Sequence, residues 1–312
     1  MKVRAFKQVD VFGAGPYLGN ALAVVLDGTD LLDEEMQHFA RWTNLSETTY
    51  LLPPSEAGAV GGADYRVRIF TPGAELPFAG HPTLGSCHAW LQAGGRPRTD
   101  REVVQECETG LIRIRRDGTR LAFAAPKLVR SNPDAQLLAR VTAALGLKAR
   151  QVRSAQLLDN GPVWLGLLLD GRESVLQLRP DHLALKNLGQ KVGVVAVEDT
   201  GSTALLIARS NREARAFAPR AGETALACLD APQVEVRAFA APVGVDEDPV
   251  TGSLNASLAQ WLIADGIAPA AYIAAQGACL GRAGRVHIGQ DEGAQIWVGG
   301  DSVTCVEGTV NL

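Results

Sequence analysis

The chain of 312 residues has few cysteines, and their arrangement argues against functions that depend on paired thiols. There are five cysteines, an odd number, and no C-x-x-C motif occurs. A disulfide framework or a zinc site would need paired or closely spaced cysteines, so neither is expected. Reduced thiols are typical of the cytoplasm, which is the predicted location of the protein.

The sequence also lacks the charge and the apolar runs that nucleic-acid and membrane partners would require. The net charge is −4, and the basic residues are scattered rather than clustered. No apolar stretch approaches the roughly 18 residues needed to cross a bilayer, and residues 1–12 alternate like a strand instead of forming a signal-peptide core. With 46% hydrophobic and 21% charged residues, the composition is that of an ordinary soluble globular protein.

One strand–turn–helix segment occurs twice in the chain. In the first copy, the strand sequence VRIF (67–70) leads to His81, a proline and an apolar stretch that ends in Trp-Leu. In the second copy, VRAF (236–239) leads to Asp248, a proline and a similar stretch. The repetition predicts two similar halves, with His81 and Asp248 at equivalent positions where two helices begin.

The remaining patterns predict mostly strands, and therefore an α+β fold. A segment with two prolines, residues 126–135, is the best candidate boundary, which gives an N-terminal half of 1–125, a C-terminal half of 126–300 and a terminal strand 301–312 that returns to the first half. Helices are expected at 33–43, 82–94 and 135–145. Strands are expected at 1–12, 20–27, 47–53, 63–70, 103–110, 111–117, 120–125, 163–169, 192–198, 204–210 and 286–289.

Three side chains are candidates for chemistry, and each also has a structural interpretation. Glu47 is either a charged residue on a sheet edge or a general acid/base whose pKa is raised by burial. His81 and Asp248 are either helix-capping residues or groups that face a ligand, because the free N–H groups of a helix start can bind an anion. The matching of the two halves favours one site built between them.

Three other motifs favour structural interpretations. The glycine-rich segment 13–19 superficially resembles a dinucleotide-binding turn, but a strand follows it where that motif requires a helix, so a plain turn is expected. Cys87 lies in an apolar helix, where a thiol is an inert filler. The glycines of the segment around Arg282 and Arg285 predict a tight turn, and the role of the two arginines is left open.

At these residues the chain resembles the PhzF-like family, named for phenazine biosynthesis, within the diaminopimelate-epimerase-like fold. The matching segments occur from one end of the chain to the other. They are the Asp10-Val11-Phe12 opening with GNALAVV (19–25), NLSETT (44–49), FAGHPTLG (78–85), NGP (160–162), GVDEDPVTGS (244–253) and the Gln276-Gly277…Gly281-Arg282 turn.

The resemblance implies two pseudo-symmetric domains, each a curved, barrel-like sheet around a central buried helix, with the site in the cleft between them. It implies that Glu47 transfers a proton, that Gly80, His81, Asp248 and Ser253 line the substrate site, and that Gly252 contributes its backbone N–H. Asp248 and His81 would orient the substrate and assist proton movement. No metal or organic cofactor is implied, and a homodimer is expected.

These observations predict a cofactor-independent isomerase that moves a proton and a double bond in a small carboxylate-bearing substrate. Two alternatives remain open at this point. The first is a small-anion-binding protein without catalysis. The second is a thiol-dependent amino-acid epimerase or racemase, although the related epimerases carry cysteines at both helix starts, where this chain has His81 and Asp248.

Overall fold

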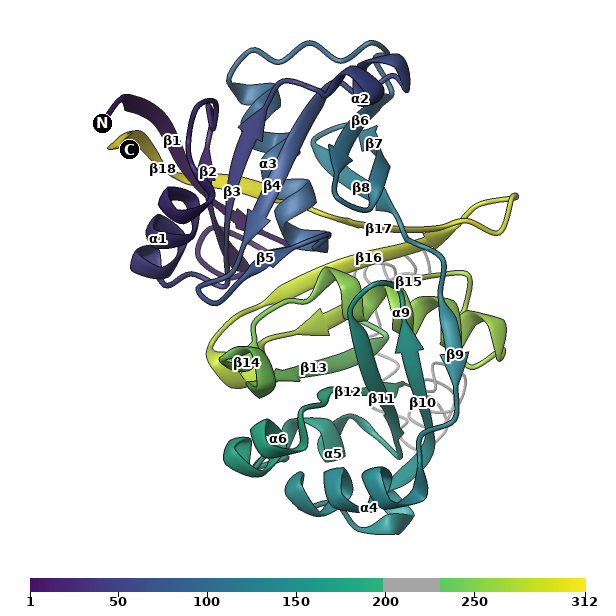
Figure 1. Ribbon diagram of the computed structural model, residues 1–312. Coiled ribbons are helices and arrows are strands. Elements are labelled where there is room, and N and C mark those ends of the chain that lie inside the picture. Colours follow the sequence, from purple (N-terminus) through teal and green to yellow (C-terminus); the bar gives the residue numbers. More distant parts are fainter. Residues whose placement is uncertain (199–230) are drawn as a thin grey trace, which may run out of the picture.

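The structure, a computed structural model, describes residues 1–198 and 231–312 (Figure 1). The strands within these residues form one hydrogen-bonded system of 18 strands, accompanied by fewer helices. The expected α+β class is therefore confirmed. The strand expected at 204–210 lies outside the described residues.

The N-terminal half is a curved sheet around a helix that is buried on almost every side (Figure 1). This helix, α3 (Gly80–Gln92), has Pro82 in its first turn, where a missing N–H costs no hydrogen bond. The other elements of this half are β1 (Val3–Val11), β2 (Asn20–Val25), α1 (Asp33–Thr43), β3 (Glu47–Leu52), α2 (Glu56–Val60), β4 (Tyr65–Phe70), β5 (Glu75–Leu76), β6 (Glu102–Cys107), β7 (Gly110–Asp117) and β8 (Arg120–Ala124).

The C-terminal half repeats this plan around α9 (Gly252–Ala264), a second buried helix of 13 residues. Its small residues Gly252, Ser253 and Ala256 are buried, which lets neighbouring elements approach the helix closely. The other elements are β9 (Val129–Ser131), α4 (Ala135–Ala144), η1 (Ala149–Gln151), β10 (Val152–Asp159), β11 (Val163–Leu169), α5 (Arg172–Leu176), α6 (His182–Leu188), β12 (Lys191–Val197), β13 (Val234–Ala240), η3 (Ala241–Val243), β14 (Val245–Asp248), β15 (Ala271–Gln276), η4 (Ala278–Leu280), β16 (Gly284–Gln290), β17 (Ile296–Gly300) and β18 (Ser302–Asn311).

The strand registers show that the two halves correspond residue by residue around these helices. In the N-terminal half, β3 runs parallel to β2 and antiparallel to β4, with Thr48 opposite Phe70. In the C-terminal half, β12 runs parallel to β11 and antiparallel to β13, with Val192 opposite Phe239. Phe70 and Phe239 end the two copies of the repeated sequence, so β3 and β12 occupy equivalent positions.

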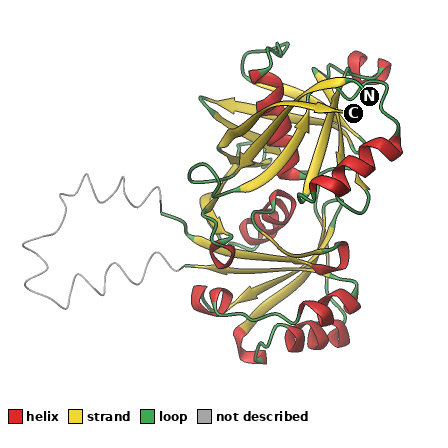
Figure 2. Cartoon of the chain, turned by 90° about the vertical axis from the view of Figure 1, so that its left-hand side faces the viewer, coloured by secondary structure: helices red, strands yellow, loops and turns green. Residues whose placement is uncertain are grey.

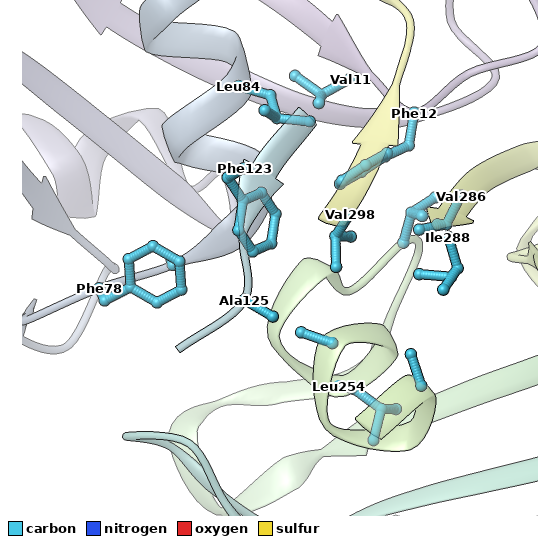
Figure 3. Close-up of a cluster of buried hydrophobic side chains, with 14 of the residues drawn as sticks. Val11, Phe12, Phe78, Leu84, Phe123, Ala125, Leu254, Val286, Ile288 and Val298 are labelled. Carbon is cyan, nitrogen blue, oxygen red and sulfur yellow. The ribbon is translucent and has the colours of Figure 1, made fainter. Parts of the chain in front are cut away.

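Two strand pairings and a shared core join the halves. The last strand, β18, pairs with β1, and β17 pairs with β8. One hydrophobic cluster contains buried side chains from both halves, including Phe78, Phe123 and, on α9, Leu254 (Figure 3). The two buried helices are therefore fixed relative to each other, while the boundaries expected at 125/126 and 300/301 stay predictions.

The predicted elements agree with the structure most closely where hydrophobic periodicity was strong. The helix expected at 33–43 is α1 with the same bounds, and the helix expected at 82–94 begins two residues earlier, at Gly80. The sequence patterns missed the strands β5, β9, β10, β14, β15 and β17 and the short helices α2, α5 and α6. Seen from the side, the short helices α5 and α6 lie with α4 on the outer face of the C-terminal half (Figure 2). Within the described residues, no helix has the length and apolar character needed to span a membrane.

Candidate active site

A cavity of about 480 Å³ is lined by residues of both halves. Three of the predicted site residues line it: Glu47, Asp248 and Ser253. Gly80, His81 and Gly252 are not part of the lining; Gly80 and Gly252 directly follow the lining residues Ala79 and Thr251, and the His81 ring lies next to Glu47. The remaining walls are largely apolar and include Leu76, Pro77, Phe78, Pro162, Trp164, Pro242 and Val245.

The two buried helices meet at their first residues, and both positions require glycine. A Cβ placed on Gly80 would lie 2.7 Å from the Cα of Gly252, which no real Cβ tolerates. Neither Ala79 nor Thr251, which precede the helices, caps the following backbone with its side chain. The first N–H groups of both helices therefore remain available where the two halves face each other.

The expected equivalence of His81 and Asp248 is wrong. His81 is the second residue of α3, and its counterpart in α9 is Ser253. Asp248 instead ends β14, four residues before α9, and its counterpart is Leu76, which ends β5 four residues before α3. Proline follows both His81 and Asp248 in the sequence, and this shared dipeptide pattern suggested an alignment that is out of register in space.

Glu47 is the first residue of β3, and its carboxyl group is confined among other polar groups. Its side chain is 14% exposed, and its Oε2 lies 3.3 Å from Nε2 of His81 without forming an aligned hydrogen bond. Burial, followed by the negative charge of Asp248, raises the pKa of Glu47 to about 8. The carboxyl can thus both hold and release a proton near neutral pH.

His81 faces Glu47 as a neutral imidazole. Burial lowers the pKa of His81 to about 3. On the other side of the ring, the amide Nδ2 of Asn20 lies 3.4 Å from Nδ1, while its N–H groups also donate to Asp248 Oδ1 at 2.8 Å and to the Val250 carbonyl at 3.0 Å. His81 therefore presents an uncharged ring to Glu47.

Asp248 is held in place by a polar network that the sequence did not single out. Asn20 Nδ2 donates to Oδ1 at 2.8 Å and Thr251 Oγ1 donates to Oδ2 at 2.5 Å. Gln276 donates to Thr251 Oγ1 at 2.9 Å and supports this arrangement. Burial raises the pKa of Asp248 to about 6, while the Thr251 and Asn20 hydrogen bonds oppose the rise. Asn20 and Gln276 both lie in the motifs that carried the family resemblance, and these motifs could have indicated the two residues from the sequence.

Ser253 is oriented by two residues of the C-terminal half. The indole Nε1 of Trp164 donates to Ser253 Oγ at 3.3 Å, and Asn160 Nδ2 donates to the Ser253 carbonyl at 3.0 Å. Lys191, the first residue of β12, lies beside them, with its Nζ 5.1 Å from the centre of the Trp164 ring. The sequence patterns did not single out Trp164 or Lys191.

The other motifs have structural roles, as expected. The segment 13–19 leads into β2, and the Arg282 guanidinium donates to its Tyr17 carbonyl at 2.7 Å, while Arg285 binds the neighbouring Gly284 carbonyl. Cys87 is fully buried, and burial raises the pKa of its thiol to about 12, so it is not a nucleophile or base. The described residues contain no group of three or more His, Cys, Asp or Glu side chains placed to hold a metal ion.

Comparisons with known proteins agree with this architecture. The model of the family described as "PhzC-PhzF: Phenazine biosynthesis-like protein" matches residues 9–225 and 223–308. The chain belongs to this family. It is 32% identical over 324 residues to "Antisense-enhancing sequence 1" of Schizosaccharomyces pombe, which covers 99% of both chains.

Two further similar proteins bear on activity and fold. The chain is 37% identical over 180 residues to "Trans-2,3-dihydro-3-hydroxyanthranilate isomerase" of Pseudomonas aeruginosa, a match that covers 57% of this chain and 61% of that protein. The crystal structure of a PhzF-family protein from Bacillus anthracis superposes with a TM-score of 0.77 at 20% identity, over 100% of both chains. The expected family, fold and isomerase class are therefore confirmed.

Proposed function

We propose that this PhzF-family isomerase moves a proton and a double bond within a small carboxylate-bearing substrate, using Glu47 as its acid and base. The observation that carries the proposal is the Glu47 carboxyl itself, which lines the cavity with a raised pKa and an Oε2 that has no hydrogen-bond partner among the described residues. A group that exchanges a proton with carbon must reach that proton and titrate near the working pH.

The chemistry needs no group besides those of the chain. The Glu47 carboxylate takes a proton from a saturated carbon of the substrate, and the electrons of that C–H bond form a new double bond. The electrons of the original double bond then shift to its far carbon, which receives the proton back from Glu47. Atoms and charge balance, and one carboxyl serves both steps on one face of the substrate.

The neighbouring residues would bind and orient the substrate. Gly80, Gly252 and Ser253 at the helix starts would hold the carboxylate through N–H and hydroxyl groups. Asp248 and the neutral His81 would orient the reacting part of the molecule and assist proton movement. Because a family relative is named for trans-2,3-dihydro-3-hydroxyanthranilate, that compound is the first substrate to try.

The test compares the native chain with Glu47→Gln in deuterium oxide. Native protein should convert the compound with deuterium appearing in the product, while Glu47→Gln should abolish this incorporation and keep the ligand affinity within about threefold. Glu34→Gln, at an exposed position on α1, is the matched control and should behave as native. Undiminished turnover by Glu47→Gln would refute the assignment.

The same experiment separates the alternatives. Tight binding without isotope exchange in the native protein, across a panel of unsaturated acids, would favour an anion-binding protein. Sensitivity to alkylating agents would favour a thiol-dependent epimerase, which the burial of Cys87 argues against.

The proposal also includes a homodimer located in the cytoplasm. Membership of the family supports the homodimer. The odd number of cysteines, without a C-x-x-C motif, supports the cytoplasmic location. Light scattering of the purified protein would measure its mass against the 33.0 kDa of one chain.

A further inference from the structure

The strand registers place Lys191 at the position that corresponds to Glu47. Glu47 directly precedes Thr48, the partner of Phe70, and Lys191 directly precedes Val192, the partner of Phe239. Each residue is also the first of its strand to pair with the parallel neighbour, Glu47 with Leu22 and Lys191 with Trp164. Both side chains line the same cavity, one from each half.

The charges at these two equivalent positions are opposite. Lys191 is half-buried, and burial lowers its pKa while the negative charge of Glu47 opposes the change. Among the described residues, no carboxylate lies within 4.0 Å of its Nζ, although an ammonium that is partly withdrawn from water gains from an anionic partner. Trp164 lies between Lys191 and Ser253, because its ring centre is 5.1 Å from Nζ and its indole N–H donates to Ser253 Oγ.

We propose that Lys191 binds the substrate carboxylate together with Ser253 and the start of α9, and thereby sets which way the substrate lies in the cavity. The inference rests on the proposed function, because it assumes that the ligand is an acid whose reacting carbon faces Glu47. The anion would lie toward the C-terminal half and the reacting C–H toward the N-terminal half. Glu47 and Lys191 occupy equivalent backbone positions in the two halves. Their opposite charges therefore determine the orientation in which the substrate binds.

A charged ligand would also remove the energetic cost of the unpaired lysine. An ammonium taken out of water loses hydration, and a carboxylate at hydrogen-bond distance replaces it with a charge-assisted bond. Such a bond contributes about 1.5–3 kcal/mol, which corresponds to roughly tenfold or more in affinity. The second lysine of the cavity lining, Lys186 on α6, is exposed and therefore gains much less from a bound anion.

The test measures binding of an inert acid and its neutral counterpart, so that it does not depend on turnover. Titration calorimetry with benzoate and benzamide should show that the native protein prefers benzoate. Lys191→Met should weaken benzoate binding by about tenfold or more and leave benzamide binding unchanged, while Lys191→Arg should restore most of the loss. Lys186→Met is the matched control for the loss of one positive charge and should change benzoate affinity by less than about threefold.

Three results would overturn the inference: no preference of the native protein for benzoate over benzamide, native benzoate affinity in Lys191→Met, or an equal loss for both ligands in that variant. The outcome is independent of the Glu47 assignment. If Glu47→Gln still exchanges deuterium, the proposed reaction fails while the binding result for Lys191 stands. If Lys191→Met binds benzoate with native affinity while Glu47→Gln is inactive, only the role of Lys191 is refuted.

Discussion

Glu47 opens β3 in the N-terminal half, and Lys191 opens β12 in the C-terminal half, at equivalent places in two equivalent strand ladders. A second pair of equivalent positions, Leu76 and Asp248, also lines the cavity and also differs in charge. The N-terminal half thus contributes a carboxyl and an apolar side chain, where the C-terminal half contributes an ammonium and a carboxyl. The repeated backbone therefore places the cavity between the halves, and different side chains at matched positions give the two sides of the cavity different charges.

Positions that build the two halves, in contrast, keep both residue type and contact. Arg68 follows Val67 in the first repeat and forms a two-point ion pair with Glu75, with Nη2 2.5 Å from Oε2. Arg237 forms the same pair with Glu247, with Nη2 2.8 Å from Oε2. Each pair ties the strand of the repeat, β4 or β13, to the strand that leads toward the buried helix.

The largest effect is expected when Asp248 is given the side chain of its counterpart. Asp248→Leu should reduce kcat/KM by about 10²- to 10⁴-fold, because the substrate would lose the carboxyl proposed to orient it, and Asn20 and Thr251 would lose their acceptor. Steady-state kinetics would measure this, and Leu76→Val, a small change at the counterpart, should cost less than about fivefold. If Asp248→Leu keeps more than a tenth of native activity, the difference between the halves at this position is not functional.

The two arginine pairs should differ strongly in their contribution to stability. Arg237 and Glu247 have side chains that are only 5% and 7% exposed, so Arg237→Met leaves a buried carboxylate without its partner and should lower the free energy of unfolding by about 3–5 kcal/mol. Arg68 and Glu75 are 23% and 32% exposed, and Arg68→Met should cost about 1 kcal/mol or less. Urea denaturation of both variants tests this, and equal losses would contradict it.

The sequence predicted the repeat, α1 and the catalytic candidates because these depend on local periodicity and on short motifs. It could not predict the spatial register of the two helix starts, since the extra residues between β13 and α9 shift Asp248 away from the place of His81. It also missed Lys191 and Trp164, because their meaning comes from pairing between strands that no local pattern specifies. Long-range register decides which side chains face a cavity, and one sequence alone carries little information about it.

Replacing either glycine at the contact between the helix starts should destabilise the protein to a similar extent. Gly80→Ala would place a Cβ 2.7 Å from the Gly252 Cα, and Gly252→Ala would place one 2.8 Å from the Gly80 Cα. Because backbone cannot yield as a side chain does, each variant should lower the free energy of unfolding by about 1–3 kcal/mol. The control is Gly289→Ala in β16, where a Cβ meets no atom within 4 Å and the change should stay within about 0.5 kcal/mol. A loss confined to one helix would show that the halves do not share this contact symmetrically.

The pH dependence tests whether Glu47 and Lys191 interact electrostatically across the cavity. The pKa of Glu47 is raised from 4.5 to about 8, so the folded protein binds a proton there that the unfolded chain has released. The stability due to this group is therefore present below pH 4.5 and is lost as the pH rises toward 8, and Glu47→Gln should gain stability relative to native protein over that interval. Urea denaturation at pH 5 and pH 8 measures the gain, which should be larger at pH 8.

Activity should change with pH in the opposite direction, because in the proposed reaction only the deprotonated Glu47 can take a proton from carbon. A plot of kcat/KM against pH should rise as Glu47 loses its proton. The positive charge of Lys191 lowers the pKa of Glu47, so Lys191→Met should move this rise to higher pH, and Lys191→Arg should leave it in place. Lys186→Met, the exposed control, should leave the profile unchanged. If the profile of Lys191→Met stays fixed or moves to lower pH, the Lys191 ammonium does not lower the pKa of Glu47.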